Sequence, residues 1–121
     1  MTFVIEENIM SRRLMIAMLS LGLAWSFAPR LALAQESHIA QAIHHAREAV
    51  VAGREGKPST LVRHATEALH HAKAQQQERP NAQVKEAIAR LEEGIRFGEK
   101  RRRSATRIVY RALQQLERAP Q

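Results

Sequence analysis

The stretch IAQAIHHAREAVVAGRE, residues 39–55, recurs 45 residues later as VKEAIARLEEGIRFGEK, residues 84–100. Both copies carry apolar residues at intervals of three and four, a spacing that predicts an amphipathic helix with one buried face. A second pair is related by a shift of 44 residues, ATEALHHAKA at 65–74 and VYRALQQLER at 109–118. The sequence therefore predicts one helical hairpin that is used twice.

Turn-forming residues separate the four helical segments. The first segment is expected to stop at Gly53 and Gly56 and the third at Gly98, because glycine is common where helices end. Short polar side chains at the starts of the segments are expected to act as N-caps. These expected N-caps are Ser59 or Thr60 for the second helix, Asn81 for the third and Ser104 for the fourth.

Four amphipathic helices with short connections predict an all-α protein, an antiparallel up-down four-helix bundle built from two helical-hairpin repeats. Hairpin one spans residues 37–77 and hairpin two spans residues 81–118, within a single domain at 35–121. The first hairpin is rich in alanine, which allows close helix approach but buries little apolar area per residue. Two loosely associated hairpins, or a chain that orders only with a partner, therefore stay open as alternatives.

Residues 1–34 have the pattern of an export signal. Two arginines at 12–13 precede an apolar run at 14–28, and the small-x-small motif at 32–34 predicts cleavage after Ala34. The apolar run, about 15 residues, is shorter than the roughly 20 that span a bilayer, so an uncleaved anchor is the weaker interpretation. The arginine pair leaves the twin-arginine route open beside the general one. Either route predicts the bacterial periplasm.

Composition limits how the exported domain is stabilised. The 121-residue chain carries 19 Lys and Arg against 12 acidic residues, for a formal net charge of +7, and it has no cysteine. The exported domain therefore has neither disulfides nor thiolate metal ligands. Its stability must come from a small helical core, helped by metal or by self-association.

All six histidines fall into one spacing used twice, HIAQAIHH at 38–45 and HATEALHH at 64–71. At about 100° per residue, each helix carries two histidines two turns apart along one edge of its apolar stripe, and a third that points to solvent. The edge positions are His38 and His45 on the first helix and His64 and His71 on the second, and the outward positions are His44 and His70. The second hairpin has none of these histidines, so the helical repeat does not require them.

Metal binding by the edge histidines depends on the neighbouring helix. Two helical turns rise about 10 Å, which is too far for two nitrogens bound to one ion at about 2.0–2.1 Å. An antiparallel hairpin would place His38 near His71 and His45 near His64, with Glu67 on the same strip as a further oxygen ligand. The two stripes either meet in the groove between the helices or diverge on opposite flanks, and the sequence leaves both possibilities open.

Three segments, HIAQAIHHAREAVVAGREG, LVRHATEALHHAKA and VKEAIARLEEGIRFGEK, resemble the small metal-binding protein family, and the likeness runs from His38 to about Glu117. The resemblance implies an exported, His-rich four-helix bundle that binds divalent metals, copper above all, and buffers or scavenges them without a catalytic centre. The matched positions are His38, His45, His64 and His71, with His44 and His70 in the same octets. The family pattern places histidines in all four helices, whereas this chain has none after His71, which implies fewer bound ions.

Imidazole chemistry narrows the choice of metal. Neutral imidazole suits Cu(II), Ni(II) and Zn(II), and the usual affinity order favours copper. We therefore expect the six histidines and Glu67 to bind a divalent transition metal, Cu(II) first and Ni(II) or Zn(II) next. Protons compete near the ordinary histidine pKa of about 6.5, so uptake should fail in mild acid. The simpler interpretation is that the histidines are solvated polar residues on alanine-rich helices.

The basic segment EKRRRSATR, residues 99–107, offers an alternative function. It is either a solvated loop or a surface that binds anionic partners, such as lipid headgroups or other polyanions, through Lys100, Arg101, Arg102, Arg103 and Arg107. Export and the scarcity of aromatic residues argue against nucleic acid. A structural or chaperone-like helical protein that binds a partner through apolar faces is a third hypothesis. An enzyme is the least expected class, because the exported domain has no cysteine nucleophile and no aspartate to orient a histidine.

Overall fold

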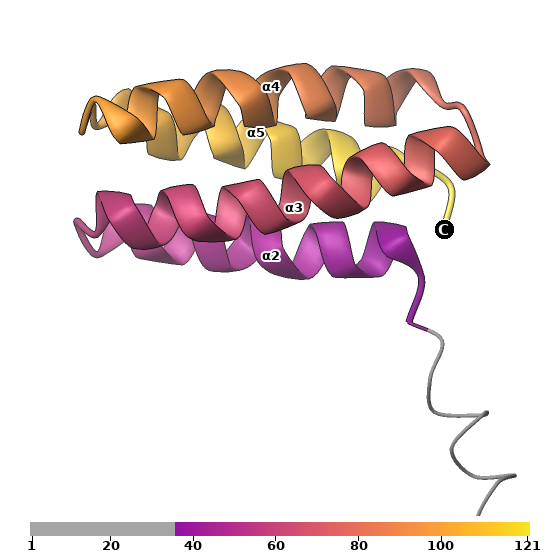
Figure 1. Ribbon diagram of the computed structural model, residues 1–121, viewed down its shortest axis with the longest axis horizontal. Helices are drawn as coiled ribbons and strands as arrows, with labels where there is room; N and C mark the ends of the chain where they lie inside the picture. The colour runs from indigo at the N-terminus through magenta and orange to yellow at the C-terminus, as the bar shows by residue number, and fades with distance from the viewer. Residues whose placement is uncertain (1–35) are drawn as a thin grey trace, which may run out of the picture. The chain divides into compact units, whose positions relative to one another are not determined.

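The computed structural model describes residues 36–121, and this part of the chain is built from four α-helices. Their bounds are α2 His38–Arg54, α3 Pro58–Glu78, α4 Ala82–Glu99 and α5 Ser104–Arg118 (Figure 1). Residues 36–121 contain no β-strand. The prediction of an all-α four-helix bundle is therefore confirmed.

The predicted signal peptide at 1–34, with its cleavage after Ala34, lies outside the described residues. None of the described helices combines the length and the apolar character that are needed to cross a bilayer. Ser37–Gln121 form one compact unit, so the four helices share one core.

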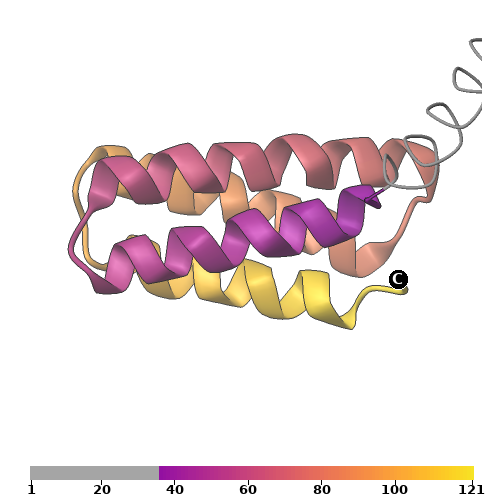
Figure 2. The same cartoon turned by 90° about the horizontal axis from the view of Figure 1, so that it is seen from below.

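The four helices form a closed ring, in which each helix packs against two others. Helix α2 contacts α3 and α5, and α4 contacts the same two helices. The pairing of helix ends shows that neighbours run in opposite directions. His38 at the start of α2 lies beside Glu78 at the end of α3, and Gly53 near the end of α2 lies beside Thr106 near the start of α5. Figure 2 shows the same back-and-forth course of the chain.

Apolar residues at helical spacing fill the centre of this ring. The largest fully buried side chains are Ile39, Leu61, Leu91, Leu116, Val84 and Val109. Alanines supply much of the remaining core of α2 and α3, including Ala42, Ala46, Ala49, Ala65, Ala68 and Ala72. Because alanine fills little space, these two helices pack closely, and residues at the edge of their interface come within reach of one another.

Helix α2 ends at Arg54, between Gly53 and Gly56, and α4 ends at Glu99, one residue after Gly98, so the predicted helix stops are confirmed. A Cβ atom on Gly53 would lie 2.8 Å from Leu61 Cδ1, and one on Gly98 would lie 2.8 Å from Val62 Cγ2. Both glycines therefore also allow close approach of neighbouring helices, α3 at both positions and α5 at Gly53. Only the neighbouring helices reveal this second role, because a glycine near the end of a periodic segment can end a helix, admit a neighbour, or do both.

The helix starts match the expected N-caps at one position. The Asn81 side chain accepts hydrogen bonds from the amides of Gln83 and Val84, at 2.8 and 3.1 Å, which confirms the predicted cap of α4. The other two cap predictions are wrong, since neither α3 nor α5 has a side-chain cap. Helix α3 begins at Pro58, before both expected cap residues, because proline suits the first position of a helix. Helix α5 begins at Ser104 itself.

Candidate metal centre

The edge histidines of α2 and α3 face each other in the groove between the two helices. Their rings lie in the order His38, His71, His45 and His64, alternating between the helices, and we name these four side chains the imidazole row. Successive ring centroids are 5.6, 5.7 and 5.8 Å apart. Of the two arrangements that the sequence left open, the structure therefore has the one in which the stripes meet.

The imidazole row presents ring nitrogens that lack ordinary protein partners. The Nδ1 atoms of His38 and His71 are 3.3 Å apart, and which of them donates depends on which ring carries a proton there. The Nδ1 atoms of His45 and His64 are buried and have no hydrogen-bond partner among the described residues. A buried polar atom left unpaired costs free energy, so these nitrogens suit a bound ligand such as a metal ion.

The spacing of the His38–His71 pair fits coordination of one ion. Two nitrogens bound to a four-coordinate ion at about 2.0–2.1 Å lie about 3.3–3.4 Å apart when the angle between the bonds is tetrahedral. The two Nδ1 atoms are 3.3 Å apart, which is within this range. When neither atom carries a proton, a cation between them would also relieve the repulsion of two facing lone pairs.

Glu67 brings a carboxylate to the middle of the imidazole row. One ligand atom from each of His45, Glu67 and His71 lies within 4.8 Å of the other two. The two histidines are partly buried, and Glu67 is exposed. Two imidazoles from different helices and one carboxylate form a donor set that suits divalent transition ions.

A second carboxylate, that of Glu78, was missed by the sequence analysis. Its Oε1 atom lies 3.4 Å from Nε2 of His38, the ring nitrogen that does not face His71. Glu78 follows His71 at the same interval of seven at which His71 follows His64, so all three share one strip of α3. This interval could have identified Glu78. A carboxylate beside the outer nitrogen of a ligating histidine typically orients the ring in metal sites.

His44 and His70 lie beside the imidazole row and are exposed to solvent. The His44 ring meets the His45 ring edge-on at a centroid distance of 5.3 Å, and His70 meets His71 in the same way at 5.4 Å. Neighbouring residues of a helix point about 100° apart, so these rings face away from the ligand groups of the row. The structure thus separates four converging histidines from two that face solvent.

Burial favours the neutral form of two rings in the row. Desolvation lowers the pKa of His71 below its ordinary value of 6.5, and the neighbouring histidines lower it further, against an opposing effect of Glu67. Desolvation is also the largest cause that lowers the pKa of His64, followed by the charge of Arg63. Metals bind the neutral imidazole, so these shifts favour coordination near pH 7.

The residues of the anion-binding alternative lie at the other end of the bundle. Lys100, Arg101, Arg102 and Arg103 are exposed between α4 and α5, and Arg107 is exposed on α5. This connection lies near the end of α2, since a Cβ atom on Gly53 would meet Thr106. The imidazole row starts at the beginning of α2, so the structure keeps the two sets of residues apart.

Comparison with known protein families supports metal binding by this chain. A family model described as small metal-binding protein matches residues 11–119, which is most of the chain. The chain belongs to the small metal-binding protein family. A comparison with curated proteins finds no match. The family and the His45–Glu67–His71 group together point to metal ions as partners of this chain.

Hairpin two supports the candidate centre without supplying a histidine to it. Helices α4 and α5 have no histidine, and they pack against α3 and α2 respectively. Their larger buried residues, such as Leu91 and Leu116, fill core volume that the small alanine side chains of hairpin one do not fill. The second hairpin therefore holds α2 and α3 at the separation that lets their edge histidines meet.

Proposed function

We propose that this protein is exported to the periplasm and there sequesters or buffers divalent transition metals, copper first and nickel or zinc next. One observation carries the proposal. Four imidazoles from two helices converge in a row whose Nδ1 atoms either face each other at 3.3 Å or are buried without a partner among the described residues. Solvated surface histidines have neither property, so the simpler interpretation does not account for the row.

The chemistry of the donor atoms supports a divalent ion. Affinity for nitrogen and oxygen ligands rises along the first-row metals to Cu(II) and falls again at Zn(II). The chain has no cysteine, so the thiolate that favours Cu(I) is not available to the row. We therefore expect the protein to select Cu(II) over Ni(II) and Zn(II), with competition between metals set by their relative concentrations.

The arrangement favours reversible binding over catalysis. The candidate ligands are imidazoles and carboxylates, and none of them is a nucleophilic side chain activated by a neighbouring base. The four rings of the row are only partly buried, so an ion can enter and leave from the open side of the groove. A periplasmic protein of this kind would limit the free metal concentration by mass action.

Calorimetry of the purified protein with Cu(II), Ni(II) and Zn(II) at neutral and acidic pH tests the proposal. Replacing all four histidines of the imidazole row by glutamine should remove most of the Cu(II) binding. The matched control replaces His44 and His70 by glutamine, which removes two imidazoles from the same helices and should retain most of it. Equal binding by the four-site variant and the unchanged protein would reject the assignment.

Export is tested separately from metal binding. Fractionation of bacterial cells that express the full chain should recover the protein in the periplasm, and its mass should correspond to a chain that starts at Gln35. A variant with both arginines at 12–13 replaced by lysine distinguishes the twin-arginine route from the general one. Recovery of the uncleaved chain in the cytoplasm would contradict the proposed location.

A further inference from the structure

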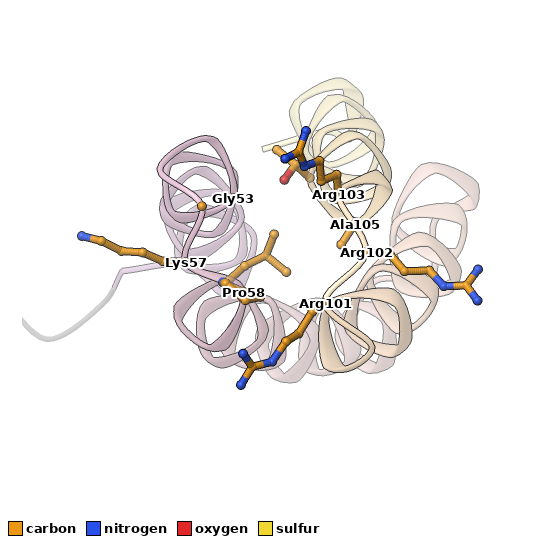
Figure 3. A pocket seen from close by; sticks show the side chains of 11 residues that line it. Gly53, Lys57, Pro58, Arg101, Arg102, Arg103 and Ala105 are labelled. Carbon is orange, nitrogen blue, oxygen red and sulfur yellow. The ribbon is translucent and has the colours of Figure 1, made fainter.

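A cavity of about 280 Å³ lies at the end of the bundle remote from the imidazole row. It lies between the connection that joins α2 to α3 and the connection that joins α4 to α5 (Figure 3). Pro58, Leu61 and Ala105 form an apolar wall, and Gly53 and Gly98 also line the cavity. None of the candidate metal ligands lines this cavity.

Cationic side chains surround the opening. Lys57, Arg101, Arg102 and Arg103 are among the lining residues, and no lining residue is acidic. Lys57 pairs with Glu55 at 3.0 Å, which offsets part of its charge. Within residues 36–121, the three arginines have no carboxylate at ion-pair distance. Figure 3 shows these three side chains pointing outward and away from one another, so an anion held by two of them requires their side chains to rotate towards the cavity.

The helix ends at this cavity add to the positive potential of the arginines. Helices α3 and α5 begin here, and neither has a side-chain cap on its first amides. Helices α2 and α4 end here, but backbone amides of the following connections donate to their last carbonyls, at 2.9–3.3 Å. The last carbonyls of α2 and α4 are thus hydrogen-bonded. At the start of α5 the amides of Ala105 and Thr106 also donate to the carbonyls of Arg102 and Arg103, at 3.1 and 3.3 Å, so the helix starts add only a modest positive potential.

Arg101 occupies a position that the other hairpin fills with glycine. The same pattern of two backbone hydrogen bonds ends α2 and α4. The left-handed residue of this pattern is Gly56 after α2, with φ of 72°, and Arg101 after α4, with φ of 56°. The two positions are 45 residues apart, which is the offset of the sequence repeat. Left-handed backbone is unfavourable for a residue with a Cβ atom, so arginine here lowers stability relative to glycine, as functional residues often do.

We propose that this cavity binds a phosphate monoester, with its organic part against the apolar wall and its phosphate at Arg101 and Arg103. Guanidinium groups bind phosphate through paired, charge-assisted hydrogen bonds. The Arg102 guanidinium already lies over the Phe97 ring, 5.5 Å from its centroid, and is therefore assigned a supporting role. A volume of about 280 Å³ admits a compact group, which belongs either to a small soluble ester or to the headgroup region of a lipid.

Amide NMR spectra of the full-length, isotope-labelled protein in metal-depleted buffer test this proposal. The probes are inorganic phosphate, butyl phosphate, and phosphatidylcholine vesicles with or without phosphatidic acid. Butyl phosphate should shift the amides of Gly53, Gly56 and Thr106 at lower concentration than inorganic phosphate, because its chain also contacts the apolar wall. Added salt should weaken the binding. A response to vesicles only when they contain phosphatidic acid, without one to butyl phosphate, would assign the phosphate to a lipid.

The variant Arg101→Gly separates loss of the ligand from loss of the fold. Glycine relieves the left-handed backbone, so the variant should unfold at a higher urea concentration, while its affinity for the phosphate probe should fall by about tenfold or more. The control Arg118→Gln makes the same charge change at the far end of α5 and should leave the affinity unchanged.

Three results would overturn the phosphate proposal: no shift at these amides with any probe, unchanged affinity in Arg101→Gly, or an equal loss in Arg118→Gln. Because no metal is present, none of these results depends on the proposed metal function.

Discussion

The rings of His45 and His71 lie parallel across the groove between α2 and α3, with an interplanar angle of 4° and centroids 5.7 Å apart. His71 also faces His38 through Nδ1 at 3.3 Å, and it shares a group of possible ligand atoms with Glu67. One side chain thus belongs to both candidate ligand groups of the imidazole row. Metal binding at either group should therefore weaken when the His71 side chain is removed.

The variant His71→Gln should therefore weaken Cu(II) binding more than the same change at any other single histidine. Loss of a residue that merely supports a ligand typically costs roughly 10–100-fold in affinity, and loss of a shared ligand should cost at least as much. Competition titrations against a chelator of known affinity give the ratio. The control is His70→Gln, the exposed neighbour. A larger effect at His38, His45 or His64 would show that His71 is not the shared ligand.

Glu78→Gln should lower Cu(II) affinity roughly tenfold without changing the number of ions bound, because Glu78 contacts the nitrogen of His38 that faces away from the row, at 3.4 Å. Glu67→Gln should instead remove a direct oxygen ligand and change the visible absorption of bound Cu(II). Glu99→Gln, an exposed change at the other end of the bundle, is the control. If Glu78→Gln and Glu99→Gln behave alike, Glu78 has no part in positioning His38.

The lowered pKa values of His64 and His71 predict how stability depends on pH without metal. As pH falls through about 6.5, the unfolded chain takes up protons at these residues before the folded chain does. The free energy of unfolding should therefore be highest above this range and decrease as pH falls through it towards the lower folded-state values. Urea unfolding between pH 8 and pH 5 measures the effect. The double variant His64→Gln, His71→Gln should show a weaker dependence, and an unchanged one would assign the effect to other groups.

Gly94→Ala should destabilise the bundle although alanine is the better helix former. A Cβ atom on Gly94 would lie 2.6 Å from Val109 Cγ2, and Val109 is fully buried with a stiff, β-branched side chain. The gain in helix propensity is about 1 kcal/mol, whereas overpacking costs about 1–3 kcal/mol. We expect the free energy of urea unfolding to fall by up to about 2 kcal/mol. Adding Val109→Ala should reduce the further effect of Gly94→Ala, and a stabilised single variant would contradict the packing of α4 on α5.

The two hydrogen bonds that Asn81 accepts predict a loss of about 1 kcal/mol in unfolding free energy for Asn81→Ala. Ser104→Ala should have a much smaller effect, because Ser104 is the first residue of α5 and makes no cap bond. Urea denaturation of both variants gives the comparison. A larger loss for Ser104→Ala would support the sequence-based assignment that the structure contradicts.

Much of the fold was predictable because apolar periodicity is a property of each helix alone. Residues such as Ile39, Leu91 and Leu116 lie in the core where the spacing placed them. The helix ends near Gly53 and Gly98 were predictable, whereas the close contact of both glycines with neighbouring helices was not, since that contact depends on how the helices pack. Glu78 lies at a seven-residue interval that was visible in the sequence. Its role beside a metal ligand could be assigned only once the structure placed its carboxylate next to His38.

The sequence by itself determined the four helices, their buried faces and the grouping of all six imidazoles into two matching octets. Only the tertiary structure decided that the stripes of His38 and His45 and of His64 and His71 meet in one groove. It also joined Lys57 and Arg103 at one cavity, although they belong to different hairpins. The physical reason is that periodicity sets the face of a single helix, whereas a meeting between helices depends on their relative rotation, which the packing of the shared core sets.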